Sequence, residues 1–277
     1  TLPGKSEVMQ KPRWRHLTWW KDQIGGRLLI DVTPSLLAEY RDKLARGEDR
    51  LRSPATVVRY MAALSHAFSV AVREWEWLDD SPLRKVSKPK EPRGRVRFLS
   101  DDERKILLVA CKQSKAPYLY PLVVLALSTG ARRGELLGLT WGDIDLKRKV
   151  AILHQTKNDE RRALPLAGHA LDCVEKLAEI RRIDTNLLFP DETGKKPIEI
   201  RPAWERVLKE AGIEDFKFHD LRHSAASYLA MSGASLAEIA EVLGHKTLQM
   251  VKRYSHLSEQ HTASVVSKMN EKIFGGG

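Results

Sequence analysis

The sequence predicts a mainly α-helical protein with a small β-hairpin or sheet, built as an N-terminal helical bundle followed by a larger mixed α+β domain. Three observations predict this class. Apolar residues recur at helical spacing along most of the chain, a basic stretch with prolines interrupts them near residue 90, and one pair of segments alternates like strands. The 277 residues suffice for two domains, and the 42% apolar content allows a buried core.

We expect residues 1–13 to form a mobile lead-in and residues 14–87 to form the helical bundle. The first helix is predicted near residues 14–23. Thr33-Pro34 and Ser53-Pro54 each place a capping hydroxyl directly before a proline, which favours the first helical position. Two further helices are therefore expected to begin there.

Residues 88–97 read KPKEPRGRVR, and this mixture of prolines, a glycine and positive charges without an apolar period predicts a basic linker. The larger domain spans residues 98–277 and opens with a capping box from Ser100 to Glu103. Residues 150–154 and 162–166 are predicted to pair as a β-hairpin. Helices are expected at residues 101–113, 121–128, 132–139, 168–182, 201–211, 219–232, 235–243 and 247–252.

The chain is basic, with 47 Lys and Arg against 36 Asp and Glu and a formal net charge of +11. Such a chain attracts polyanions, of which nucleic acid is the commonest. No apolar run is long enough to cross a bilayer and no signal-peptide pattern begins the chain, so a soluble cytoplasmic protein is expected. Cys111 and Cys173 form no CxxC pair, which predicts buried thiols rather than a zinc site or a disulfide.

Three segments carry residue types that suit phosphate chemistry. In the first, Thr129-Gly130 predicts a turn and Arg132 lies at the start of the helix that follows. A guanidinium and free backbone N–H groups both favour a phosphate at that place. Glu135 lies one helical turn further and can brace Arg132 by an ion pair. Taken alone, a surface Arg–Glu pair is the more ordinary interpretation.

In the second segment, His219 and Arg222 are three residues apart at a helix start, so both project from one face. Such a pair can hold a phosphate and transfer a proton near neutral pH. His219 and His223 share a spacing used by metal ligands, but no carboxylate or cysteine accompanies them, so no metal is expected.

In the third segment, His245 follows the end of a helix and Tyr254 ends a short basic helix that carries Lys252 and Arg253. A tyrosine among cations is expected to lose its proton more easily than a free phenol and to attack phosphorus. Each segment alone has an ordinary structural explanation. The fixed order of two arginines, two histidines and a tyrosine in one domain favours a catalytic set.

The segments TGARRGELLGLTWGDIDL, HDLRHSAAS and LGHKTLQMVKRYSHL together resemble the tyrosine recombinase (phage integrase) family, which shares its catalytic set with type IB topoisomerases. The resemblance spans roughly Trp14 to Phe274, and SPATVVRYMAALSHAFSVAVREW is similar to the family's core-binding domain. It implies that residues 98–277 form a catalytic domain. It also implies a site-specific recombinase that cuts and rejoins DNA through a 3′-phosphotyrosine bond, without metal, ATP or other cofactor.

The resemblance further implies a role for each matching residue. Arg132 and Arg222 would clamp the scissile phosphate, and Tyr254 would be the nucleophile. His219 would be the general base for the tyrosine, and His245 would hydrogen-bond a nonbridging phosphate oxygen.

In this family a lysine in the β-hairpin protonates the leaving 5′ oxygen. Lys157, in the turn TKND, matches that place, and Lys147 and Lys149 lie nearby as alternatives. The two domains would hold opposite faces of the duplex while the basic linker follows the DNA backbone. Candidate DNA contacts are Arg59, Lys88, Lys90, Arg93, Arg95 and Arg97.

The expected partner is double-stranded DNA at a specific recombination site, bound by a homotetramer in the synaptic complex and by a chain that is monomeric when free. The apolar tail after Tyr254 is expected to dock either on a neighbouring protomer or on its own domain. Many phage integrases carry a further N-terminal arm-binding domain, which this sequence does not show. The chain also lacks an initiator methionine, which is compatible with truncation.

Two other functions stay open at this point. A type IB topoisomerase would use the same chemistry to relax DNA as a monomer, although the core-binding bundle disfavours it. A non-enzymatic helix-turn-helix regulator fits residues 234–247 and the positive charge, but it does not account for the catalytic set.

Overall fold

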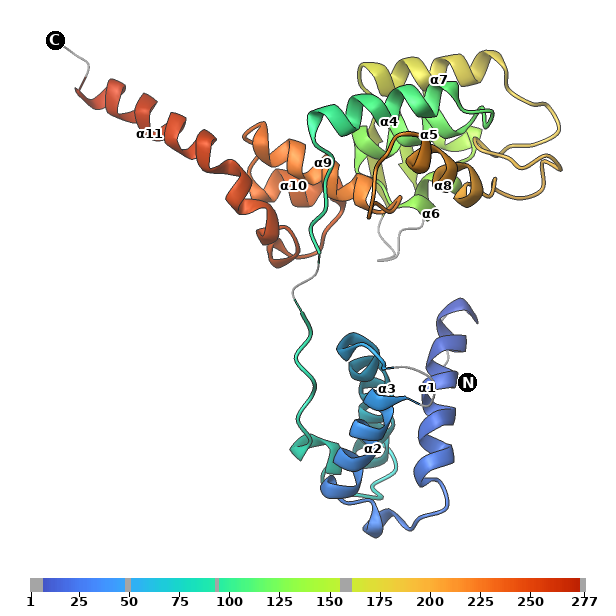
Figure 1. Cartoon of the computed structure of the whole chain (residues 1–277), viewed down its shortest axis with the longest axis vertical. Coiled ribbons are helices and arrows are strands. Elements are labelled where there is room, and N and C mark those ends of the chain that lie inside the picture. Colours follow the sequence, from blue (N-terminus) through green and yellow to red (C-terminus); the bar gives the residue numbers. More distant parts are fainter. Residues whose placement is uncertain (1–6, 48–50, 93–94, 155–160, 275–277) are drawn as a thin grey trace. The chain divides into compact units, whose positions relative to one another are not determined.

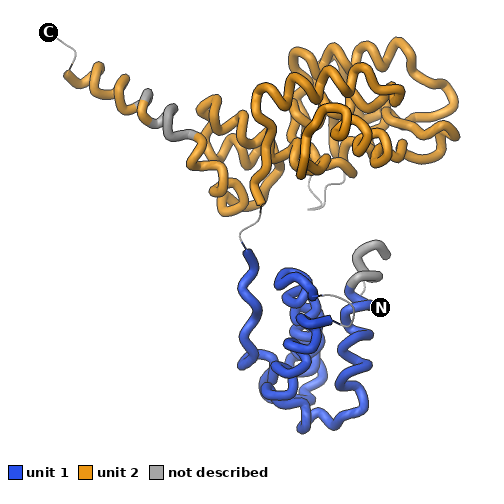
Figure 2. The backbone as a smooth tube through the Cα atoms, viewed as in Figure 1, with its two compact units in different colours: residues 1–94 blue, residues 95–277 orange. Residues whose placement is uncertain are grey.

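The computed structural model describes residues 7–47, 51–92, 95–154 and 161–274. The chain divides into two compact units, residues 1–94 and residues 95–277, and each is considered by itself (Figure 2). Among the described residues the first unit is helical, and the second combines helices with a three-stranded sheet. The predicted fold class, mainly α with a small sheet, is therefore confirmed.

Three helices make up most of the first unit (Figure 1). The Thr33 and Ser53 hydroxyls accept hydrogen bonds from backbone N–H groups three residues further along, and a proline follows each of them in the first turn. Both predicted helix starts are thus confirmed, and the reason is the satisfied N-cap. The helices are α1 (Glu7–Ile24), α2 (Pro34–Arg46) and α3 (Pro54–Arg73).

The first helix begins earlier than predicted. Residues 7–13 belong to α1, whereas the sequence analysis expected a lead-in there. Pro12 suggested the wrong boundary. A proline close to a helix start removes one backbone hydrogen bond, but its fixed φ angle suits the helix, so the following turns can still form.

Helix α3 is the core helix of the bundle. Its length and mean hydropathy of 1.3 would allow it to cross a membrane, so the statement that no apolar run is long enough was wrong. In this structure α3 packs against both α1 and α2, and its Met61 and Leu64 share one core with Trp20 and Leu37. Its apolar face is therefore explained by the bundle itself.

The second unit is built around α5, whose sequence LYPLVVLALST is apolar along its whole length. This helix is buried because α4, α7 and α9 pack against it. Cys111 and Cys173 lie in the same core as free buried thiols, as expected, and burial raises the pKa of Cys111 to about 12. The helices are α4 (Asp101–Gln113), α5 (Leu119–Thr129), α6 (Arg133–Leu137), α7 (His169–Glu179), α8 (Arg201–Glu210), α9 (Asp220–Met231), α10 (Leu236–Leu243) and α11 (Glu259–Phe274).

The sheet is antiparallel, in the order β1-β2-β3. The predicted hairpin is confirmed as β2 and β3, with Ala151 opposite Leu164 and both buried. The two residues of β1 are too few to form a sequence pattern, and this strand was missed. Residues 155–160, which join β2 to β3 and contain Lys157, lie outside the described residues. The strands are β1 (Ile144–Asp145), β2 (Val150–Leu153) and β3 (Arg162–Pro165).

After α10 the chain forms two 3₁₀ segments, Leu248–Met250 and Lys252–Ser258, where one helix over residues 247–252 was predicted. With three residues per turn, positions three apart share a side of a 3₁₀ helix. Val251, directly before the second segment, and Tyr254, three residues further along, are both buried in a cluster with residues of α9 and α10. The tight winding therefore turns Tyr254 inward.

Candidate active site

The site begins where α5 ends. Gly130 caps α5 with a left-handed backbone (φ 59°), and a Cβ there would collide with the side chain of Leu243 on α10. Only glycine combines this conformation with so close an approach. The chain then turns into α6, with Arg132 as the residue directly before the helix.

Glu135 organises two arginines. Arg132 Nη1 donates to Glu135 Oε1 at 2.6 Å, and the Arg132 backbone N–H donates to Oε2 at 2.9 Å. The predicted Arg132–Glu135 ion pair is therefore present. Arg162, the first residue of β3, donates to the same Oε2 at 3.0 Å and to the Val242 carbonyl at 3.2 Å. One buried carboxylate thus fixes the start of α6, the start of β3 and, through Arg162, the end of α10.

Arg222 is a buried cation on α9, with 5% of its surface exposed. Its Nη1 donates to the Gly130 carbonyl at 2.7 Å, while its Nη2 is buried without a hydrogen-bond partner. Burial, followed by the charges of Arg132 and Arg162, lowers the pKa of Arg222 to about 10. A buried donor without a partner is costly, so this nitrogen is placed to receive an anion.

His245 is held at the end of α10, directly after the left-handed Gly244. Its backbone N–H donates to the Ala240 carbonyl at 2.8 Å, and its side-chain Nδ1 is buried without a partner. Burial and then the positive charge of Arg222 lower the pKa of His245 to about 4. The imidazole is therefore neutral near pH 7 and can donate one hydrogen bond to a phosphate oxygen.

Tyr254 is 2% exposed, and its hydroxyl lies 2.5 Å from Nδ1 of His223. Burial raises the pKa of Tyr254, and the positive charges of Arg253 and Arg222 oppose the rise without reversing it. The expectation that this phenol loses its proton easily was therefore wrong. Desolvation of the phenolate outweighs the attraction of the cations, so the hydroxyl needs a base.

His219 and His223 both belong to the start of α9, but they differ in what they contact. His219 is exposed, and its ring centre lies 5.6 Å from that of His223. Partial enclosure and the charge of Arg222 lower the pKa of His219, and Asp220 opposes this. In the described structure the hydrogen-bond partner of Tyr254 is His223, whereas the family resemblance assigns the proton acceptor role to His219.

Two residues of the site were missed by the sequence analysis, although signals for both exist. His223 follows His219 by four residues and Arg222 by one, so helical spacing places it on the same side of α9 as His219. Arg162 alternates with the apolar Leu164 and Leu166, which indicates an inward position on the strand. A charged residue at an inward position needs a partner, which here is Glu135.

The candidate DNA contacts divide into free and engaged cations. Arg59, Lys88 and Lys90 are exposed, and Arg93 lies outside the described residues. Arg95 is bound to the carboxylates of Asp215 and Asp220, and Arg97 is bound to Glu103 through both terminal nitrogens. The positive charge of these last two arginines is compensated within the protein, which removes the main reason for expecting a DNA contact.

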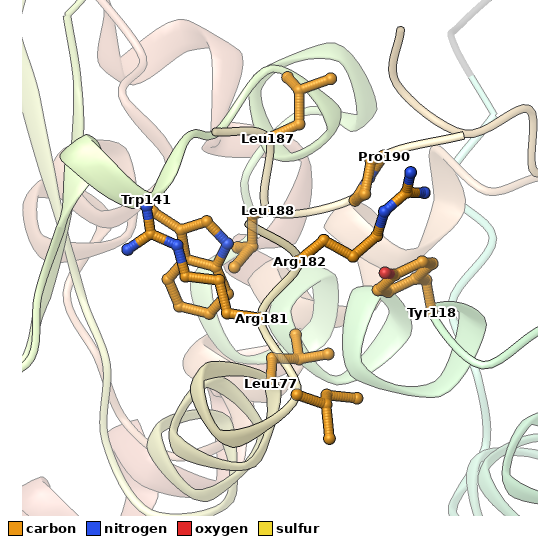
Figure 3. Close-up of a pocket in the computed structure, with 9 residues that line it drawn as sticks. Tyr118, Trp141, Leu177, Arg181, Arg182, Leu187, Leu188 and Pro190 are labelled. Atoms are coloured by element: carbon orange, nitrogen blue, oxygen red, sulfur yellow. The ribbon is translucent and has the colours of Figure 1, made fainter. Parts of the chain in front are cut away.

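A small pocket elsewhere in the second unit has a structural explanation. Figure 3 shows Arg181 over the ring of Trp141 and Arg182 beside Tyr118. The Arg181 guanidinium carbon lies 5.3 Å from the Trp141 ring centre, and Arg182 donates to Asp184 and to the Asp191 carbonyl. These arginines stack and cross-link the loop after α7, so we assign the pocket no catalytic role.

Fold and site together define a class of protein: an α-rich unit in which two arginines, a neutral histidine and a buried tyrosine lie close enough to act on one another electrostatically. Comparison with known proteins gives the family. Residues 97–261 match the phage integrase family, and the chain belongs to that family. The three motifs of the second unit that carried the resemblance lie inside the matched region, whereas the segment similar to the core-binding domain, residues 53–75, lies outside it.

Two relatives illustrate the relationship. The integrase of Salmonella phage P22 is 33% identical over 233 residues, which are 80% of this chain and 58% of the relative. The shufflon-specific DNA recombinase of Escherichia coli is 35% identical over 251 residues, 89% of this chain and 62% of the relative. The chain therefore spans about 60% of the length of these two relatives.

Solved structures share the fold. The Tn1549 transposon integrase in complex with transposon right end DNA has a TM-score of 0.78 at 18% identity, covering 96% of each chain. A lambda integrase dimer bound to a core site has a TM-score of 0.75 at 20% identity, covering 93% of this chain and 92% of that chain.

Proposed function

We propose that this chain is the DNA-cleaving part of a site-specific recombinase, which cuts and rejoins double-stranded DNA through a 3′-phosphotyrosine bond to Tyr254. One observation carries the proposal. The buried polar atoms without partners on Arg222 and His245 lie in the same electrostatic environment as the Tyr254 hydroxyl, since the charge of Arg222 acts on both of the other residues. An anion site beside a tyrosine nucleophile is what transesterification of a phosphodiester requires.

The proposed reaction uses the groups as the structure presents them. Arg132, Arg222 and His245 hold the nonbridging oxygens of the scissile phosphate. The oxygen of Tyr254 forms a bond to phosphorus while the bond from phosphorus to the 5′ oxygen breaks. The phenol gives its proton to a histidine, and the leaving 5′ oxygen receives a proton, for which we propose Lys157. Attack by a 5′-hydroxyl from another strand reverses every one of these transfers and rejoins the DNA.

The energetics of this reaction favour cations that are already in place. Charge accumulates on the phosphorane oxygens in the transition state, and arginines fixed in a partly buried site stabilise it without further reorganisation. Arg132 is fixed by Glu135 and Arg222 by the Gly130 carbonyl. One phosphodiester bond replaces another of similar energy, so we expect the reaction to need neither ATP nor a metal ion.

We propose a homotetramer on DNA as the active assembly, in the cytoplasm where the DNA is accessible. The apolar residues of α11 support it. Val266, Met269, Ile273 and Phe274 are between 47% and 76% exposed, so the described structure does not bury them on their own unit. A neighbouring protomer would cover this apolar row, which favours docking in trans over docking in cis.

The helix-turn-helix regulator is less well supported. Residues 234–247 contain α10, whose Ile239, Ala240 and Leu243 are buried in the same cluster as Tyr254. The exposed positions of α10 include Glu238 and Glu241, and carboxylates would repel the phosphates of a DNA groove. We therefore interpret α10 as support for the catalytic tyrosine and for His245.

The proposal is tested by trapping the covalent intermediate. Supercoiled plasmid carrying the DNA that flanks the gene is incubated with the protein in EDTA without ATP, and the reaction is stopped with SDS. We expect a protein–DNA adduct that is absent with Tyr254→Phe, although that variant still binds DNA. An adduct with Tyr254→Phe would overturn the assignment of the nucleophile. A plasmid with two sites then distinguishes recombination, which exchanges strands, from topoisomerase activity, which only relaxes the DNA.

A further inference from the structure

Arg162 joins elements that lie far apart in the sequence. Its Nη2 donates to Oε2 of Glu135 at 3.0 Å, and its Nη1 donates to the carbonyl of Val242, 80 residues away, at 3.2 Å. The first contact ties β3 to α6, and the second ties β3 to the last turn of α10. The side chain is 12% exposed, so most of this bridge lies inside the second unit.

The Val242 carbonyl is one of the last four carbonyls of α10. A helix leaves these groups without an internal partner, so they need hydrogen bonds from elsewhere. A cation at that place also suits the negative end of the helix dipole. Arg162 meets both needs, and the position of the end of α10 therefore depends on a side chain of β3.

Gly244 brings the Arg162 guanidinium next to His245 in the chain. Gly244 has a left-handed backbone (φ 65°), and a Cβ there would lie 2.5 Å from Nη1 of Arg162. Nη1 therefore lies against the residue that directly precedes His245, at a distance that only glycine allows. Burial lowers the pKa of His245 to about 4, and the cations that add to this effect include Arg162.

We propose that Arg162 is a positioning residue for His245. By holding the last turn of α10 against β3 and Glu135, it sets where the imidazole meets the scissile phosphate. This inference rests on the proposed function, because it concerns how that site is assembled. Arg162 acts through His245, whose Nδ1 is buried without a partner, and it does not itself bind the DNA.

The bridge needs a forked side chain. A guanidinium presents its N–H donors in one rigid plane, whereas an ammonium is a single point charge on a flexible stem. Arg162→Lys keeps the positive charge that balances Glu135 but cannot reach both Glu135 and the Val242 carbonyl. This variant therefore removes the bridge without leaving the buried carboxylate unpaired, and we expect it to fold.

A double-mutant cycle on cleavage tests the proposal. Single-turnover cleavage of a nicked duplex, made from the DNA that flanks the gene, is measured with saturating DNA for the wild type, Arg162→Lys, His245→Ala and the double variant. We expect Arg162→Lys to be about 30-fold slower, since a small misplacement of a catalytic group suffices, and His245→Ala to be about 100-fold slower. The double variant should stay within about fivefold of His245→Ala, because a positioning residue has no effect without the group that it positions.

Two independent effects would instead multiply to roughly 3000-fold. A double variant more than about fivefold slower than His245→Ala would therefore overturn the proposal, as would a wild-type rate in Arg162→Lys. A weaker DNA affinity of Arg162→Lys with a normal rate at saturation would also overturn it, because Arg162 would then be a DNA contact.

Arg161→Lys is the matched control. Arg161 is the exposed neighbour of Arg162, and this variant should cleave at nearly the wild-type rate. Thermal melting and DNA affinity confirm that each variant folds. If Arg162→Lys does not fold, Arg162→Gln, which keeps an N–H donor for one of the two contacts, takes its place in the cycle under the same criteria.

The trapping experiment on Tyr254→Phe keeps the two proposals separate. An adduct that survives Tyr254→Phe, or the lack of any adduct with the wild type, removes the proposed function and this inference together. An adduct that depends on Tyr254, combined with effects that multiply in the double variant, removes only the inference.

Discussion

The arginines of the second unit form two groups that differ in how their donors are satisfied. Arg95 and Arg97 are neutralised by carboxylates close to the surface. Arg222 is almost fully buried, faces other arginines, and keeps one terminal nitrogen without a partner. All three count equally toward the net charge of the sequence. The comparison shows that burial among other arginines, together with a terminal nitrogen that has no partner, distinguishes Arg222 from these two surface arginines. Under the proposed function this nitrogen would bind the phosphate.

The largest difference between the groups is expected in catalysis. Arg222→Lys should reduce single-turnover cleavage roughly 100-fold to 1000-fold, because a point charge cannot keep the Gly130 contact and a phosphate oxygen at once. Arg97→Lys is the matched control and should cleave at nearly the wild-type rate. Equal cleavage rates for the two variants, measured with saturating DNA, would contradict the separation of Arg222 from the neutralised surface arginines.

The next effect concerns Glu135, whose carboxylate pairs with Arg132 and Arg162. Glu135→Gln removes the charge that balances Arg132 and Arg162 in a site where the Glu135 side chain is 7% exposed. We expect a loss of about 3 kcal/mol in the free energy of unfolding, because a buried pair is broken. Glu205→Gln breaks the exposed pair with Arg201 and should cost less than about 1 kcal/mol. Urea denaturation of both variants decides the matter, and similar losses would contradict the role given to Glu135.

The smallest effect is the pH dependence of the stability that the Glu103–Arg97 pair contributes. Hydrogen bonds from Arg97 lower the pKa of Glu103 from 4.5 to about 2. A lowered carboxyl pKa stabilises the fold above the unfolded value, and this contribution is lost as the pH falls from about 4.5 toward 2. Between pH 5 and pH 3 the wild type should therefore lose more stability than Glu103→Gln, by about 1 kcal/mol or less because the pair is partly exposed. Parallel curves of melting temperature against pH would refute this.

Much of the fold could be predicted because its signals are local. Three such signals depend only on neighbouring residues, and the structure confirms all of them. They are the Thr or Ser cap followed by a proline, the Ser100 capping box, and the strand alternation around residues 150–166. The errors arose where packing decides. α1 continues through Pro12, and residues 252–258 wind as a 3₁₀ segment that places Tyr254 in a core with residues of α9 and α10.

The site was predictable in its residue types but not in its contacts. The order of motifs pointed to Arg132, Arg222 and Tyr254, yet the protonation of Tyr254 depends on burial, which no spacing reveals. The same holds for His223, whose partner lies 31 residues away in the sequence. Whether a cation is free or neutralised, as for Arg95, also depends on residues more than one hundred positions distant.

The shared carboxylate of Glu135 has a consequence for the protein without DNA. Arg132, Arg162 and Arg222 lie close to one carboxylate, that of Glu135, so the positive charges of the three arginines repel one another. This repulsion lowers the free energy of unfolding. A scissile phosphate would weaken the repulsion by supplying a further negative charge. DNA binding would then raise the free energy of unfolding, because the phosphate binds only the folded protein. Under the proposed function, a recombination site would complete the charge balance of the folded protein as well as serve as its substrate.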